Sequence, residues 1–202
     1  MTMRPTPQGF GPDTSERLPL PAADMMNEAQ RAAAQMLIDG PRKGVKGPFV
    51  PLLRSPVLME RLAKVGEYLR FESALPARIG EFATLVVARH VSNQFEWAIH
   101  HPLALAAGTR AGTLDDLAAG SQCPRDMDES EAVACAFAGE LLQHHGVSDP
   151  TYAAALALWG ERGVVELSTL IGYFACVSWV MNVARTPAPA TEGFSPLSAL
   201  PR

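Results

Sequence analysis

Apolar residues recur every three or four positions along most of this 202-residue chain, and this rhythm limits the fold more than any other feature. In the stretch VLMERLAKVGEYLRFE, apolar side chains stand at positions 58, 62, 65 and 69, which places them on one face of a helix. No stretch shows sustained strict alternation of apolar and polar residues with paired turn signals. The sequence therefore predicts an all-α helical bundle.

Capping residues, glycines and prolines divide the chain. We expect a first helix at 25–40, capped by Asp24 and ended by Gly40. After a packed Gly- and Pro-rich loop, the further expected helical stretches are 57–72, 76–108, 129–146, 149–163 and 164–184, with a turn at 109–120. Residues 1–22 hold five prolines and 186–202 hold four, so we predict a single helical domain at 23–185 between two irregular arms.

The charge balance and the cysteines exclude several classes of protein. With 17 Lys and Arg against 21 Asp and Glu, the net charge is −4, and no basic stripe suits a nucleic acid. The N-terminus lacks an apolar signal core, and the most apolar stretch, LSTLIGYFACVSWVMNVA, suits a buried helix better than a membrane span. Three cysteines cannot all pair and none lies in a CxxC, so we expect a cytoplasmic protein with reduced thiols.

The densest polar cluster inside an apolar stretch is NQFEWAIHH at 93–101. On a helix, Asn93, Glu96 and His100 share one face, and Glu96 can hydrogen-bond His100. A carboxylate beside an imidazole raises its pKa and fixes its tautomer, which suits a general acid or base. Glu81 reaches the same place if the chain bends near Ser92.

These residue types alone leave three interpretations open: the buried acid–base pair just described, a surface ion pair, and a metal site. A Glu–His pair four apart is commonly a solvated surface pair, although the flanking apolar residues favour burial. A metal site is a further reading, but it lacks the HExxH arrangement; its candidate ligands are His90, Glu96, His100 and His101. No GxSxG elbow, P-loop, or GxGxxG followed by a strand is present.

The stretch 47–108, with its Gly-Pro-Phe loop, and the closing VVELSTLIGYFACVSWVMNVA resemble the carboxymuconolactone decarboxylase family. The resemblance covers roughly residues 25–185. That family, which includes alkylhydroperoxidase D-like proteins, is marked by a Glu, two variable sites and a His, which fall here on Glu81, Asn93, Glu96 and His100. In the peroxidase branch both variable sites are cysteines; here neither carries sulfur, so the resemblance is to the non-redox branch and thiol peroxidase chemistry is disfavoured.

The resemblance implies a cofactor-independent carbon–carbon lyase that decarboxylates a small carboxylated lactone or a related intermediate of aromatic-compound catabolism. His100 would then donate the proton, Glu96 would orient the His100 side chain, and Glu81 would complete a proton relay. We expect no cofactor and no metal. The expected substrate-binding residues are Asn93, Trp97 and Phe49, with Arg89 or His90 as weaker candidates for the cation that an anionic substrate needs.

The same residues leave other functions open. Proton transfer next to a carbonyl also serves an isomerase or a hydrolase of a small carbonyl compound, and a redox protein related to the peroxidases is a further alternative. A helical oligomer without enzymatic activity is the third class. The resemblance implies a homo-oligomer (dimer, trimer or hexamer), whose proline-rich arms could wrap neighbouring subunits, with a small-molecule substrate and with neither nucleic acid nor membrane as partner.

Overall fold

The computed structural model describes residues 6–8, 14–190 and 193–198. In these ranges no strand forms, and an isolated antiparallel bridge joins Thr6 to Ala188. The predicted all-α fold is therefore confirmed. The helical elements are the 3₁₀ turn η1 (Ala23–Met25), α1 (Glu28–Asp39), α2 (Phe49–Leu52), α3 (Pro56–Phe71), α4 (Ala77–His90), α5 (Gln94–Ala106), α6 (Ala111–Ala119), α7 (Glu129–His144) and α8 (Asp149–Ala184).

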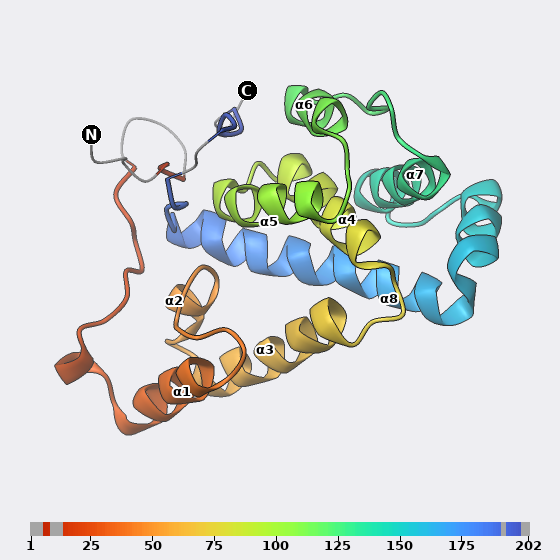
Figure 1. The fold of residues 1–202 in the computed structure, drawn as a ribbon. Coiled ribbons are helices and arrows are strands. Elements are labelled where there is room, and N and C mark those ends of the chain that lie inside the picture. Colours follow the sequence, from red (N-terminus) through yellow and green to blue (C-terminus); the bar gives the residue numbers. More distant parts are fainter. Residues whose placement is uncertain (1–5, 9–13, 191–192, 199–202) are drawn as a thin grey trace.

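The long helix α8 crosses the middle of the molecule (Figure 1). Helices α4 to α7 lie on one side of it, and α1 to α3 lie on the other. Helix α4 packs against α5, α7 and α8, so it is the centre of the larger side. The α1–α3 part and the α4–α7 part therefore lie next to each other along α8, and the surface between them is a boundary within the molecule.

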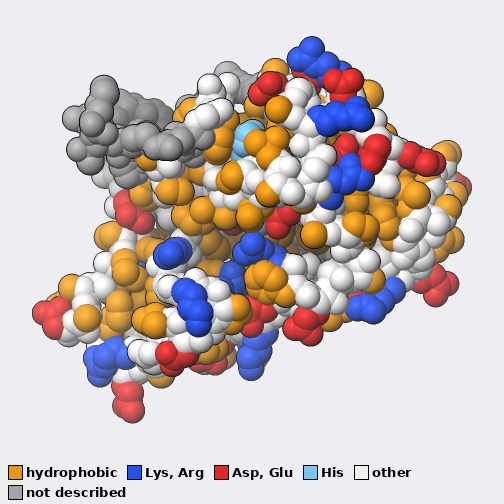
Figure 2. Space-filling view, viewed as in Figure 1, with side chains coloured by type: hydrophobic (Ala, Val, Ile, Leu, Met, Phe, Trp, Pro, Cys, Tyr) orange, Lys and Arg blue, Asp and Glu red, His pale blue; other side chains and the backbone are white. Residues whose placement is uncertain are grey.

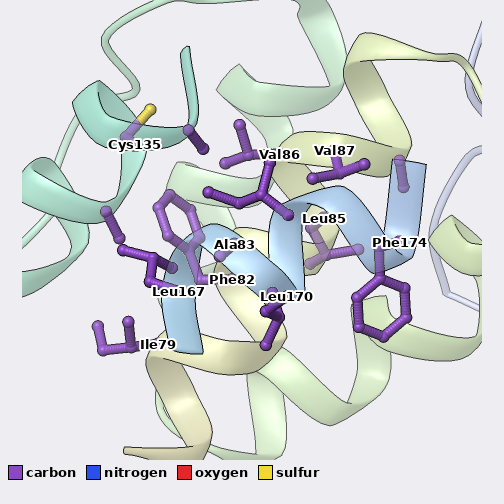
Figure 3. Close-up of a cluster of buried hydrophobic side chains, with 14 of the residues drawn as sticks. Ile79, Phe82, Ala83, Leu85, Val86, Val87, Cys135, Leu167, Leu170 and Phe174 are labelled. Atoms are coloured by element: carbon purple, nitrogen blue, oxygen red, sulfur yellow. The ribbon is translucent and has the colours of Figure 1, made fainter. Parts of the chain in front are cut away.

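Each part has its own apolar core. In the larger core, Phe82 and Leu85 of α4 face Leu170 and Phe174 of α8 (Figure 3). The smaller core forms among α1, α2 and α3 and includes Leu37, Phe49, Leu53 and Met59. Full burial of such a side chain contributes about 1.5–3 kcal/mol, so the larger core holds α4 to α8, and the smaller core holds α1, α2 and α3 together.

Two local predictions were wrong. Helix α1 is capped by Asn27, in a capping box with Gln30, whereas Asp24 lies in η1. Within residues 109–120, expected as a turn, Ala111–Ala119 form α6, which buries Thr113, Leu114 and Leu117. These few apolar positions are enough to bind a short helix to the core, although they are too few to produce a clear periodic pattern in the sequence.

The stretches expected as two helices at 149–163 and 164–184 follow one another in α8, with a kink at Gly160 (φ 65°, ψ −178°). That backbone conformation strongly favours glycine, which has no Cβ. Among the described helices, α8 is long and apolar enough to cross a membrane by length and composition alone. A core helix passes the same test, and 61 % of its tested window is buried inside this protein.

The helices lie within the range 23–185 predicted for the domain. The described parts of the two predicted arms meet each other at the Thr6–Ala188 bridge, and Arg17 bonds the end of α8 through the carbonyls of Val183 and Ala184. These contacts are within one chain. The wrapping of neighbouring subunits stays a prediction.

Candidate active site

The centre of the site is His100, whose side chain is only 3 % exposed. Its Nδ1 lies 2.5 Å from Glu81 Oε2, and its Nε2 lies 3.1 Å from Glu96 Oε2. Glu81 comes from α4, whereas Glu96 and His100 stand four residues apart on α5. The structure therefore brings together the three residues predicted to transfer protons, with one carboxylate on each side of the imidazole.

A sharp bend between α4 and α5 makes this convergence possible. Helix α4 ends at His90, and Ser92 has a positive φ of 47°, which is uncommon for a residue other than glycine. Asn93 then caps α5 by accepting a hydrogen bond from the Glu96 backbone N–H at 2.8 Å. The chain thus turns back near Ser92, as the sequence analysis required for Glu81 to reach His100.

Both ends of the chain brace this bend. Gln8 donates to the Ser92 carbonyl and accepts from the Gln94 backbone N–H, at 3.2 and 2.8 Å. The Gln94 side chain exchanges two hydrogen bonds with the backbone of Leu197, at 2.6 and 3.0 Å. The bend that carries the site is therefore fixed by residues from both predicted arms.

The surroundings of His100 favour its protonated form. An ionised carboxylate can only accept hydrogen bonds, so two such contacts to one imidazole need a proton on each ring nitrogen. Burial alone would lower the pKa of His100, but the hydrogen bonds to Glu81 and Glu96, together with their charges, raise it above its ordinary value. The site can therefore hold an imidazolium that is ready to donate a proton.

A cavity of about 290 Å³ opens against this group, where α3, α5, α8 and the loop before α2 meet. Its volume is at the lower end of the range for small-molecule sites. Glu96 and His100 lie on one wall, and the apolar lining includes Phe49, Phe95 and Phe174. Figure 2 shows a hollow between the surface of α1–α3 and the rest of the molecule, with Lys and Arg side chains near its edge.

A second, smaller cavity of about 180 Å³ lies on the other side of His100 and is lined by Glu81. His100 and Phe174 line both cavities. Glu96 belongs to the first cavity and Glu81 to the second, so the imidazole stands between two spaces with a carboxylate in each.

Phe49 lines the larger cavity, as predicted, and its position depends on the loop before it. Gly47 has a φ of 57°, and a Cβ there would lie 2.4 Å from the Phe95 ring. The Gly-Pro-Phe segment therefore packs directly on α5 because residue 47 has no side chain.

The other two predicted substrate-binding residues lie elsewhere. Trp97 is 1 % exposed in the larger core, and it does not line the cavity. Asn93 is fully buried and also does not line it: besides capping α5, its amide donates to Ser178 O and Asn182 Oδ1. Adjacent helical residues point about 100° apart, so Trp97 faces inward where Glu96 faces the cavity.

The candidate cations Arg89 and His90 are likewise remote from His100. Arg89 is buried and donates to the Ala118 carbonyl at 2.9 Å. His90 lines a different cavity, near α7. His101, next to His100, stacks on Phe194 with ring centroids 3.9 Å apart, which agrees with a structural role.

Three cations that were not predicted from the sequence line the cavity: Arg42, Lys46 and Arg70. Arg42 and Lys46 belong to the loop PRKGVKGPF, and Arg70 belongs to the last turn of α3. The basic residues of that loop, close to its Gly-Pro-Phe segment, were the signal that could have identified two of the three.

None of the three cysteines lines either of the two cavities beside His100. Cys123 is exposed, Cys135 is buried and Cys176 is partly buried, and none of the three forms a disulfide. Burial, with a smaller contribution from Cys123, raises the pKa of Cys135 to about 11. In the described part of the chain, no group of three or more His, Cys, Asp or Glu side chains is arranged to hold a metal ion.

Among solved structures, the fold is similar to the crystal structure of an alkylhydroperoxidase AhpD core, an uncharacterized peroxidase-related protein from Ralstonia eutropha JMP134. The TM-score is 0.68, and the match covers 86 % of this chain and 92 % of that one at 13 % sequence identity. No protein-family model matches the sequence, and no curated protein does either. The likeness shows that the chain has the AhpD-like helical fold.

Proposed function

We propose that this protein is a cofactor-independent enzyme that moves protons through His100, and that it is a carbon–carbon lyase acting on a small carboxylated lactone or a related intermediate of aromatic-compound catabolism. One observation carries the proposal: a buried imidazole has a carboxylate on each ring nitrogen and lines a small, largely apolar cavity. Perturbed acid–base groups in such a cavity are typical of catalytic sites.

In this reaction the bond between the carboxylate and the lactone ring breaks, and carbon dioxide leaves. The electron pair of that bond passes through the conjugated system to the lactone carbonyl. The His100 imidazolium then delivers one proton to the carbanionic product, and the neutral imidazole regains a proton from solvent. Apolar walls such as Phe49 and Phe174 keep the reacting carboxylate poorly solvated.

The two carboxylates have different tasks. Glu96 lies in the substrate cavity and orients the Nε2 side of the ring. Glu81, whose side chain is 19 % exposed, lies in the second cavity and accepts the hydrogen bond from Nδ1–H, so it holds that proton on Nδ1 while Nε2 gives up its own. Proton transfer of this kind contributes roughly 10²- to 10⁴-fold to a rate.

An isomerase or a hydrolase of a small carbonyl compound would use the same groups, and the products of the assay below distinguish these reactions. A redox function is the second candidate because the protein of similar fold is described as peroxidase-related. Asn93 and Glu96 carry no sulfur, and a thiol whose pKa is about 11, as at Cys135, is a poor source of thiolate at neutral pH.

The proposal is tested by measuring carbon dioxide release from carboxylated, unsaturated γ-lactones. His100→Gln should lower the rate by about 10²- to 10⁴-fold. His90→Gln, which changes an exposed histidine of α4 outside this cavity, is the matched control and should keep the wild-type rate. Full activity of His100→Gln would disprove the proposal. Consumption of peroxide with loss of free thiols would instead support the redox function.

A further inference from the structure

Arg70 lies in the cavity wall and forms no ion pair with any carboxylate of the described residues. Its Nε is buried and has no hydrogen-bond partner among them. Its guanidinium lies 5.2 Å from the centroid of the Phe71 ring. A partly buried guanidinium that lacks an acceptor is costly, and this cost is relieved when an anion binds beside it.

Arg42 lies in the same cavity wall and is only partly compensated. Its Nε is 3.6 Å from Glu67 Oε1, which is longer than a hydrogen bond, and this Nε also has no hydrogen-bond partner. Its guanidinium is held by the Ala63 carbonyl at 3.3 Å and stacks over Phe49 at 4.4 Å. The arginine is thus fixed in position while part of its hydrogen-bonding capacity stays free.

Tyr173 also lines this cavity, close enough to both arginines and to Glu96 to be influenced by their charges. Burial raises the pKa of its hydroxyl to about 12; the charges of Arg42 and Arg70 act to lower this pKa, and that of Glu96 acts to raise it. The hydroxyl is therefore protonated at neutral pH, and it lies within the fields of both cations and of Glu96. It can donate a hydrogen bond to an anion that sits between them.

We propose that Arg70 and Arg42, with the Tyr173 hydroxyl, form a subsite that binds a carboxylate of the substrate which does not itself react. The inference rests on the proposed function for the location of the reacting atoms at His100. Two arginines on the reacting carboxylate would stabilise the ground state and slow its loss, so the carboxylate they hold is a second one. The substrate class is then a small anion with its charged group at one end and its reacting carbon at the other.

Charge in the cavity supports this assignment. Two carboxylates around one imidazolium leave a net negative charge at the proton-transfer group, which by itself repels an anionic substrate. Arg70, Arg42 and the exposed Lys46 line the same cavity and supply three positive charges to its wall. An anion therefore enters with its carboxylate toward the arginines.

The test is a calorimetric titration with 5-oxotetrahydrofuran-2-carboxylate, a saturated lactone acid, and with its methyl ester. We expect the wild-type protein to bind the carboxylate more tightly than the ester. Arg70→Gln should weaken carboxylate binding about 10- to 100-fold and leave ester binding nearly unchanged. Arg70→Lys, which keeps the charge but loses the planar fork, should lose less affinity.

Arg61→Gln is the matched control, because Arg61 is an exposed arginine of the same helix that does not line the cavity. It should keep the wild-type preference. The subsite is disproved if the wild-type protein binds the ester as tightly as the carboxylate, or fails to bind the carboxylate at millimolar concentration, or if Arg70→Gln keeps the preference. If Arg70→Gln fails to fold, the wild-type comparison can still refute the subsite, and the partial loss of affinity expected for Arg70→Lys tests the part of Arg70.

Titration of His100→Gln separates this inference from the proposed function. Retained carboxylate preference together with lost turnover supports both. Retained turnover would disprove the role of His100 and leave the subsite standing, whereas an unchanged preference in Arg70→Gln would remove the subsite alone.

Discussion

Glu166, on α8, ties the end of α3 and the start of the loop before α4 to the central helix. Its carboxylate accepts hydrogen bonds from Tyr68 Oη at 2.5 Å, Ser73 Oγ at 2.8 Å, the Ala74 backbone N–H at 2.7 Å and Arg162 Nε at 2.8 Å. Burial alone would raise the pKa of Glu166, but these partners lower it from 4.5 to about 2. A carboxylate held in this way stabilises the folded protein only while it is ionised.

The contribution of Glu166 to the free energy of unfolding follows from that pKa. Lowering it from 4.5 to about 2 corresponds to a contribution of about 3 kcal/mol to the free energy of unfolding at pH 7. Because the pKa is lower in the folded state, the contribution is present above about pH 4.5 and is lost as the pH falls through 2. Arg162 is 62 % exposed, so solvent screening reduces its part, and we expect Glu166→Gln to cost about 2–3 kcal/mol at pH 7.

Urea unfolding followed by far-ultraviolet circular dichroism measures this difference at pH 7 and again near pH 3. The difference in the free energy of unfolding between wild type and Glu166→Gln should be less than half as large near pH 3 as at pH 7. The reason is that the stabilisation by the ionised wild-type carboxylate decreases as the pH approaches its folded-state pKa. Glu161→Gln, an exposed glutamate on the same helix, should show no such gap. A Glu166→Gln gap that stays constant with pH would refute the reasoning.

Three further predictions use the same unfolding assay. Gly66→Ala would place a Cβ 2.2 Å from Tyr173 Oη and should destabilise the protein by about 1–3 kcal/mol, whereas Gly139→Ala, with nothing within 4 Å, should stabilise it by up to about 1 kcal/mol; equal effects would contradict the packing argument. Because the pKa of His100 is raised in the folded state, its contribution to stability is complete below about pH 6.5 and is lost as the pH rises through the folded-state pKa. The difference in the free energy of unfolding between wild type and His100→Gln should therefore become smaller at alkaline pH, and an increase would contradict this sign. Asn93→Ala removes the cap of α5 and two buried hydrogen bonds and should cost about 2–3 kcal/mol; a cost within experimental error would show that the bend does not depend on it.

The proton-transfer group was the most predictable part of the site, because local geometry determines it. Glu96 and His100 are one helical turn apart, and this spacing fixes their contact as soon as the segment is helical. Glu81 required one long-range condition, the bend near Ser92. Asn93 was assigned to substrate although an Asn three residues before a Glu, at the start of a helix, is also the pattern of an N-terminal cap, and that is its position in the structure.

The arginines of the proposed subsite could not be predicted in the same way. Arg42 and Arg70 come from separate segments, and no spacing rule relates them. They line one cavity because α1 packs against α3 and α3 against α8, where Gly66 leaves room for the Arg42 and Tyr173 side chains. Such a placement is a result of tertiary packing, which a single sequence does not encode as a local pattern.

The bracing of the α4–α5 bend by Gln8 and Leu197 has a consequence for the order of events during synthesis. The helices that carry Glu81 and His100 leave the ribosome long before residue 197 does, and domains begin to fold as they emerge. Until residue 197 is made, Gln94 lacks its two hydrogen bonds to Leu197. The nascent protein can therefore have its helices in place while the bend between Glu81 and His100 is still held by Gln8 alone.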